Sequence, residues 1–303
     1  MTEPVEPPIA SGDLPGLFQA ADSASTIAQK LYLKLVAADL SVMLLGAALG
    51  AFSMSDTRHA QSLALASATS VAIGLVLTLT LQAQRLSSTW YDGRAVAEAT
   101  KTSAWRYMMR AYPYGSEVGE ADADRSLTSA FDSFLRDRRG LAGSLSSNLV
   151  QLPQITTTMR GTRGRSVDAR KAAYVEFRLA DQRRWYAARA EHNSRRARLL
   201  FILVIACHAL ALVAAIANVH WSDGPLNLTG VFAALAAALI AWTQLKRYEE
   251  QANVYGLTAQ ELRSIEEQGR HATSEDTFSR FVEESESAIT RENAIWLARR
   301  EQY

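Results

Sequence analysis

Residues 178–205 read RLADQRRWYAARAEHNSRRARLLFILVI, and the fold is decided within this stretch. Up to Arg198 it is dense in charge, whereas from Leu199 onward no charged residue follows for more than twenty positions. Because neither proline nor glycine separates the two parts, we expect one helix to run through both. A helix that passes from water into a bilayer keeps its backbone hydrogen bonds and changes only its side chains. The boundary between Arg198 and Leu199 therefore marks a membrane surface.

Apolar residues gather in four blocks, at residues 35–52, 61–84, 199–219 and 226–245. The averages conceal this, because 48% hydrophobic residues and a net charge of +1 over 303 residues suit an ordinary globular protein. About 18 to 24 helical residues cross a hydrocarbon core of roughly 30 Å. Buried core helices of a soluble protein are the alternative, but too little chain remains to cover four such blocks. The sequence predicts an all-α integral membrane protein with four transmembrane helices in two hairpins, whose long helices extend into a cytosolic helical bundle.

The charge distribution predicts the orientation. The loops inside the two hairpins, residues 53–60 and 220–225, carry little positive charge, whereas the opposite ends of the blocks are basic at Lys30, Lys34, Arg85, Arg94, Arg195, Arg196, Arg198, Lys246 and Arg247. By the positive-inside rule both loops face outward. We expect a multi-pass protein of the cell inner (plasma) membrane with both termini in the cytoplasm. The acidic, proline-rich residues 1–24 lack the pattern of a signal peptide and are expected to be disordered.

The chain reads as a duplication of hairpin and stalk. The first unit is expected over residues 25–111 with a stalk helix at 85–111, and the second over residues 166–268 with stalks at 166–198 and 246–268. Between them lies a cytosolic insert, residues 112–165, with an amphipathic helix at 126–137 and a basic GTRGR run that we interpret as a flexible linker. A C-terminal amphipathic helix is expected over residues 275–301.

The stalks carry stripes of aromatic and ionic residues. In the stalk at residues 166–198, heptad spacing predicts that one helix face is formed by Tyr174, Arg178, Asp181, Trp185, Ala188 and His192. After the second block the stripe is Trp90, Arg94, Ala97, Lys101, Ala104 or Trp105, and Met108, with Glu98 placed to pair with Arg94. After the fourth block a further stripe is formed by Tyr248, Ala252, Tyr255, Thr258, Leu262 and Ile265. These faces predict a helical bundle outside the membrane.

The stalk motifs resemble a known family. Residues 174–197, YVEFRLADQRRWYAARAEHNSRRA, precede a two-helix hairpin and resemble the SLATT domain (SMODS- and SLOG-associating two-transmembrane effector) through Tyr174, Arg178, Asp181, Gln182, Trp185, Tyr186, Ala190 and Asn193. Residues 90–109, WYDGRAVAEATKTSAWRYMM, resemble a second SLATT subtype through Trp90, Arg94, Ala97, Glu98, Lys101, Trp105 and Tyr107. The chain is thus identified as a tandem SLATT protein.

The resemblance implies a membrane effector of a bacterial conflict or anti-phage system. Such an effector would oligomerise to form a pore or disrupt the membrane on a nucleotide-linked or partner-delivered signal. Its expected partners are the lipid bilayer, further copies of itself, and a separate nucleotide-messenger enzyme or sensor protein. A non-conducting anchor that presents cytosolic helices to a partner is the alternative. A solute transporter ranks below both, because no block shows the broken-helix pattern of a substrate site.

Motifs for catalysis are missing from the sequence. It holds no phosphate-binding GxxxxGK[ST], no GxSxG, no HExxH and no paired metal-ligand spacing, and the single Cys207 lies in an apolar block. We expect no enzyme activity, no cofactor and no metal. The basic residues lie where the membrane rule puts them, so no nucleic acid is expected as a partner.

Two sets of residues within the apolar blocks predict helix packing. Small residues that allow close approach within or between chains are Gly46, Gly50, Ser70, Gly74, Thr78, Gly230 and Ala234. Asp39 and His208 are ionisable and costly in lipid, so they should face protein or water. We favour a structural role over pore lining: Asp39 would be neutralised by a nearby Lys or Arg, and His208 would bond a hydroxyl of a neighbouring helix.

Overall fold

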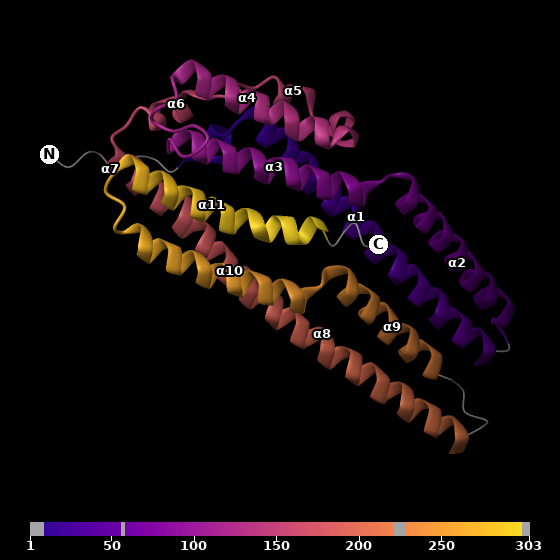
Figure 1. Ribbon diagram of the computed structural model, residues 1–303. Coiled ribbons are helices and arrows are strands. Elements are labelled where there is room, and N and C mark those ends of the chain that lie inside the picture. Colours follow the sequence, from indigo (N-terminus) through magenta and orange to yellow (C-terminus); the bar gives the residue numbers. More distant parts are fainter. Residues whose placement is uncertain (1–8, 56–57, 221–227, 299–303) are drawn as a thin grey trace. The chain divides into compact units, whose positions relative to one another are not determined.

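A computed structural model describes residues 9–55, 58–220 and 228–298, and over these ranges the chain is helical without a strand (Figure 1). The predicted all-α class is confirmed. The elements are η1 (Ser11–Asp13), α1 (Gly16–Ser55), α2 (Ala60–Ala83), α3 (Leu86–Met108), α4 (Glu120–Asp137), η2 (Arg139–Ser144), α5 (Ser147–Val150), α6 (Thr157–Arg163), α7 (Val167–Tyr174), the π-helical η3 (Val175–Ala180), α8 (Asp181–His220), α9 (Thr229–Lys246), α10 (Tyr248–Gly269) and α11 (Glu275–Ala298).

Four helices, α1, α2, α8 and α9, contain segments that are long and apolar enough to cross a membrane. Large apolar side chains on them are exposed, among them Leu65 at 69%, Phe201 at 66% and Val213 at 63%. Contiguous apolar surface of this kind marks contact with lipid or with another protein. The chain is therefore a membrane protein, and the Arg198/Leu199 boundary lies inside the single helix α8, as the sequence predicts.

The described residues divide into two compact units. The span unit is Lys30–Leu86 with Glu191–Ala252, and it holds the four apolar segments. The core unit combines Met1–Gln29, Ser87–Ala190 and Asn253–Tyr303, so it draws on both halves of the sequence. Its buried residues include most members of two predicted stalk stripes: Trp90, Ala97, Trp105 and Met108 of α3, and Tyr255, Thr258, Leu262 and Ile265 of α10.

The expectation that residues 1–24 are disordered is wrong for residues 9–24. Helix α1 begins at Gly16, and Leu17, Phe18 and Ala21 are buried in the core unit. The loop before α6 caps this helix start, because Gly16 N donates to the Pro153 carbonyl (3.0 Å) and Leu17 N to Gln154 Oε1 (3.1 Å). The acidic, proline-rich start obscured the apolar residues that follow it. Residues 1–8 lie outside the described part.

The amphipathic helix expected at 126–137 begins earlier. Helix α4 starts at Glu120, where acidic residues in the first turn complement the helix dipole. Ala123, Leu127 and Phe131 are its buried residues, and the last two belong to the predicted amphipathic segment. The C-terminal helix α11 starts at Glu275, where the Ser274 hydroxyl accepts from Thr277 N (3.3 Å).

The inward face of the stalk at residues 166–198 differs from the predicted stripe. Tyr174 and Arg178 are buried, but Asp181 and His192 are exposed, and the buried residues beyond them are Tyr186 and Asn193. The cause is η3, because a π-helical turn holds an extra residue and shifts every later position by about 100°. Beyond η3, a heptad count from Tyr174 therefore predicts buried positions that lie one residue before the observed ones.

The two hairpins end alike. Helix α2 is followed by Arg85 and helix α9 by Arg247, with φ angles of 47° and 46° in the left-handed region. A left-handed residue stops a helix, and the stalks α3 and α10 begin at the next residue. This shared geometry supports the duplication read from the sequence.

The crossing of α1 and α3 in the core unit depends on Gly93. A Cβ atom there would lie 2.9 Å from the Ala21 carbonyl oxygen and 3.1 Å from Ser25 N, both of which are backbone atoms that cannot swing away. We predict that Gly93→Ala lowers the free energy of unfolding by about 1–3 kcal/mol. Gly161→Ala is the control, because that helical position has nothing within 4 Å, and it should be neutral or stabilising. Thermal unfolding followed by circular dichroism in detergent measures both, and equal melting temperatures for wild type and Gly93→Ala would refute the close crossing.

Candidate functional site

A buried ion pair between Arg178 of η3 and Glu286 of α11 lies in the core unit. Arg178 is 1% exposed and Glu286 is 0% exposed. The contact is bidentate, with Nε donating to Oε1 at 2.8 Å and Nη2 donating to Oε2 at 2.7 Å. A planar guanidinium matches a carboxylate in this geometry, which gives direction as well as strength to the contact. The pair fixes the position of α11 against η3.

Two further helices donate to the same carboxylate. Tyr174 of α7 donates its hydroxyl to Glu286 Oε1 (3.1 Å), and Thr102 of α3 donates to Oε2 (2.8 Å). Helix α11 runs beside α3 and α10 (Figure 1), and Arg291 of α11 also pairs with Glu261 of α10. One acidic side chain therefore joins α3, α7, η3 and α11.

The electrostatics of the cluster favour its ionised form. Burial disfavours the charged guanidinium, but the Glu286 carboxylate outweighs this and raises the pKa of Arg178 above its ordinary value. Burial, together with the charge of Glu286, also raises the pKa of Tyr174, which stays a neutral donor. Removing one member of a buried pair costs about 3–5 kcal/mol, because the other charge is left without compensation. We refer to Thr102, Tyr174, Arg178 and Glu286 as the Glu286 cluster.

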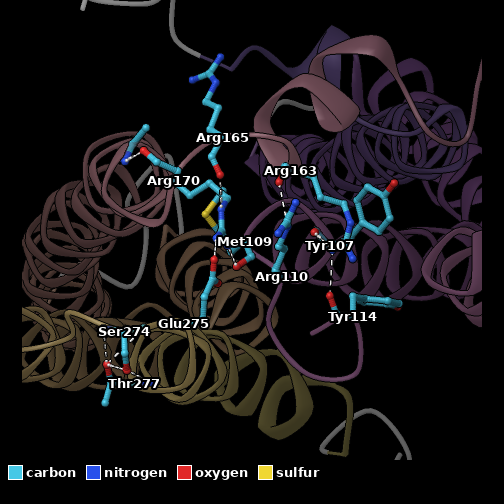
Figure 2. A network of polar contacts seen from close by, with 12 residues as sticks. Tyr107, Met109, Arg110, Tyr114, Arg163, Arg165, Arg170, Ser274, Glu275 and Thr277 are labelled. Atoms are coloured by element: carbon cyan, nitrogen blue, oxygen red, sulfur yellow. Dashed lines mark hydrogen bonds and ion pairs between the residues drawn. The ribbon is translucent and has the colours of Figure 1, made fainter. Parts of the chain in front are cut away.

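A second network fastens the end of α3 (Figure 2). Arg163 Nη1 donates to the carbonyl oxygens of Tyr107 and Tyr114, both at 2.8 Å, and its guanidinium lies over the Tyr107 ring at 4.7 Å. Arg170 Nη1 donates to the Met109 carbonyl at 2.6 Å. The last carbonyls of a helix have no partner within it and carry partial negative charge, so two buried arginines stabilise this terminus.

The same network reaches the start of α11. Arg170 pairs with Glu275, and Lys171 Nζ donates to the carbonyl oxygens of Arg270 (3.0 Å) and Ala272 (2.7 Å) in the segment between α10 and α11. The interpretation of GTRGR as a flexible linker is wrong. The first three residues of this run, 161–163, form the end of α6, and Gly164 is the C-cap; Thr156 caps the start of this helix by accepting from Met159 N (3.2 Å).

The family-motif residues gather mainly in the core unit. Trp90, Trp105, Tyr174, Arg178, Tyr186 and Asn193 are buried, Arg94, Glu98, Gln182 and Trp185 are half-buried, and Asp181 is exposed. Trp105 packs edge-on against Tyr174 (5.9 Å between ring centroids), next to the Glu286 cluster. The rings of Trp185 and Tyr186 contact Tyr255 of α10. Asn193 Nδ2, in the span unit, donates to Gln251 Oε1 at 3.4 Å.

The small residues of the first hairpin pack within that hairpin. A Cβ atom at Gly46 would lie 3.3 Å from Ser70 Cβ, and one at Gly50 would lie 3.3 Å from Ser67 Oγ. Ser67 Oγ also donates to the Gly46 carbonyl (2.8 Å). Gly74 faces Met43 Sδ across the same interface. In contrast, Thr78 and Gly230 are exposed and Ala234 is half-buried.

The two intramembrane ionisable residues lie differently from the expectation. Asp39 points its Oδ1 toward Gly74, and this buried oxygen has no hydrogen-bond partner in the described part of the chain, so the expected Lys or Arg partner is not found there. His208 is exposed, and its Nδ1 lies 2.9 Å from the Val204 carbonyl of its own helix. The expected bond to a hydroxyl of a neighbouring helix is not made in this structure, because the ring points away from the chain.

Sequence reasoning missed Thr102, Arg163, Arg170 and Glu286. A signal existed for Glu286, which follows Phe278 and Val282 at helical spacing on the apolar face of α11. A carboxylate in such a stripe indicates a buried partner of opposite charge. No comparable signal marks Arg163, since its surroundings are rich in glycine and arginine. Within the described ranges, no three His, Cys, Asp or Glu side chains converge as a metal site requires.

Comparison with protein families gives two matches in tandem. Residues 15–171 match the family described as SMODS and SLOG-associating 2TM effector domain 3. Residues 174–296 match SMODS and SLOG-associating 2TM effector domain 1. The first match includes residues 112–165, which the sequence analysis had set apart as an insert. Searches of curated proteins and of solved structures find no match.

Lys101 gives a test of the electrostatics. Burial and the nearby charge of Arg178 lower its pKa, despite Glu98 and Glu286. Between this lowered pKa and the ordinary value near 10.5, the unfolded chain binds more protons than the folded one, so the free energy of unfolding rises with pH across that window. We predict that Lys101→Met is more stable than wild type at neutral pH and that its advantage shrinks toward pH 10.5. Urea unfolding of both proteins at several pH values measures this, and a constant difference would show that Lys101 is not desolvated.

Proposed function

The chain belongs to the SLATT family of two-transmembrane effector domains, of which it carries two in tandem, and from this we propose that it is a membrane effector of a bacterial conflict or anti-phage system. In this proposal several copies associate within the inner membrane and surround a conductive path. A signal from a separate nucleotide-messenger enzyme or sensor protein triggers the change. The words "SMODS and SLOG-associating" in both family descriptions support a partner of that kind.

The exposure of His208 is the observation that carries the proposal of an oligomer. It lies nine residues beyond Leu199 in α8, about 14 Å along the helix and so near the middle of the span. An ionisable ring is costly in lipid and is expected to face protein or water. Since its contact within the chain is with its own helix, the Nε2 atom is available to a second copy or to a water-filled path.

The use of the small residues also supports association between copies. The α1–α2 interface already contains Gly46, Gly50, Ser70 and Gly74, which hold one hairpin together. Gly230 on α9 has nothing within 4 Å, and a bare glycine on a span suits close approach of another helix. Four spans are too few to enclose a wide aqueous path, so conduction requires several chains.

We predict that His208→Leu weakens membrane depolarisation while the protein still inserts. The test is induction in bacteria with a membrane-potential dye, with and without a co-expressed nucleotide-messenger enzyme. His220→Leu is the matched control, because it makes the same change on the same helix, and its Nδ1 has the same contact with the carbonyl four residues earlier, but it lies at the helix end. Wild type and His220→Leu should depolarise cells alike.

Two results would count against the proposal. If wild type never depolarises cells under any trigger, the non-conducting anchor takes its place. If His208→Leu depolarises cells as fully as wild type, the mid-span histidine is not part of the conductive assembly. Cross-linking in native membranes, run beside the dye measurement, reports whether the variant has lost association or only conduction.

A further inference from the structure

We propose that α11 is a latch that holds the α8 stalk in one of two helical registers, and that its release rotates α8. The docking of α11 and the register of α8 are independent of any conduction, whereas the consequence for the membrane rests on the proposed function. Three observations carry the inference: the buried carboxylate of Glu286 in the apolar face of α11, the π-helical η3, and the heptad stripe on α8, whose Asp181 and His192 are exposed.

The first observation is how α11 is held. Its buried face consists of Phe278, Phe281, Val282, Ala288 and Ile289, with Ser285 and Glu286 as its buried polar residues. The rings of Phe278 and Phe281 pack against Tyr174, at 6.4 Å and 5.8 Å between centroids. Apolar contact alone would let α11 slide or detach gradually. The carboxylate makes docking close to all-or-none. If α11 undocks, Arg178 remains in the core without its counter-charge and beside Lys101, a second cation.

The second observation is that Arg178 lies inside η3. A π-helical turn is rare and less favourable than the α-helix on either side, so it persists where surrounding contacts hold it. Here the holding contact is the bidentate pair with Glu286. Without that carboxylate, the only contact left to the guanidinium within the cluster is that of Arg178 Nη2 with the Thr102 hydroxyl at 3.5 Å, and η3 is free to revert to an α-helix. Because a π-helical turn holds an extra residue, this conversion rotates every later residue of the helix by about 100° about the helix axis.

The third observation is that the sequence encodes the rotated state. With a continuous α-helix from Tyr174 onward, the heptad stripe through Asp181, Trp185 and His192 takes the inward positions that Tyr186 and Asn193 hold in this structure. This stripe contains the carboxylate of Asp181, whose charge already acts on Lys101. Asp181 is exposed in the latched state. In the rotated register it can replace Glu286 as the counter-charge.

The rotation reaches the span because α8 is one helix from Asp181 to His220. Turning its stalk also turns His208, which changes the side of the helix that carries the polar ring. A signal that displaces α11 would therefore change which residues of the third span face neighbouring copies. The latch explains how an event outside the bilayer alters packing within it.

Cysteine labelling distinguishes the two registers. In a Cys207→Ser background, His192→Cys is on the exposed side of α8 and Asn193→Cys is buried. In the resting protein we expect a maleimide to label position 192 and to spare position 193. Introducing Glu286→Gln should reverse this pattern. Asp276→Asn is the matched control, because the same acid-to-amide change on α11 removes only an exposed pair with Arg280 and should leave the resting pattern intact.

A deletion tests the role of η3 directly. Removing the exposed Glu176 takes the extra residue out of the π-helical segment, so the latched register becomes an ordinary α-helix. In this background Glu286→Gln should keep the resting pattern. The latch is supported if Glu286→Gln reverses the labelling pattern and the deletion of Glu176 prevents that reversal. An unchanged pattern in Glu286→Gln, labelling of both positions because the core has unfolded, or reversal that persists in the deletion overturns it.

The dye measurement on the same strains separates the latch from the proposed function. If labelling reverses and cells depolarise without a trigger, both stand. If labelling reverses and cells keep their membrane potential, the latch stands and the conductive function fails. If labelling does not reverse while wild type depolarises cells on a trigger, the function stands and the latch is overturned.

Discussion

A carboxylate without access to water needs positive charge and hydrogen-bond donors close by, and Glu286 finds both on three other elements. Arg178 supplies the charge, and Thr102 and Tyr174 supply hydroxyl donors. The contribution of such a pair to net stability is small compared with apolar packing, because both charges must be desolvated. Its value is directional, since any other placement of α11 leaves a buried charge unmatched. The arrangement of the core unit depends on this constraint.

The constraint also joins the two family domains of the chain in one core unit. The first match ends at residue 171 and the second begins at residue 174, yet the core unit takes helices from both. Thr102 belongs to the first domain and Glu286 to the second, and Arg163 and Arg170 of the first domain hold the end of α3 and the start of α11. The duplication has thus produced two hairpins with a shared core in place of two independent copies.

The sequence predicts the spans and stalks well, because both depend on patterns that a helix displays over many residues. Charge exclusion marks the spans, and the stripes of α3 and α10 are buried as predicted. Prediction failed where a single residue or a single long-range contact determines the local structure. Heptad counting could not anticipate the π-helical turn that moves Asp181 outward, and local composition concealed that Arg163 is buried. Asp39 and His208 were expected to have partners because both are costly in lipid, but the described part of this chain does not supply them.

The central claim is that the two domains share one core at Glu286. The most direct test is a double-mutant cycle between Thr102 and Glu286, using Thr102→Val, Glu286→Gln and the combined variant in equilibrium unfolding. Residues that share a buried hydrogen bond are expected to show a coupling free energy of about 0.5–3 kcal/mol. A coupling of this size would place α3 of the first domain against α11 of the second. Strictly additive effects would contradict the account, because they would mean that the two side chains do not meet.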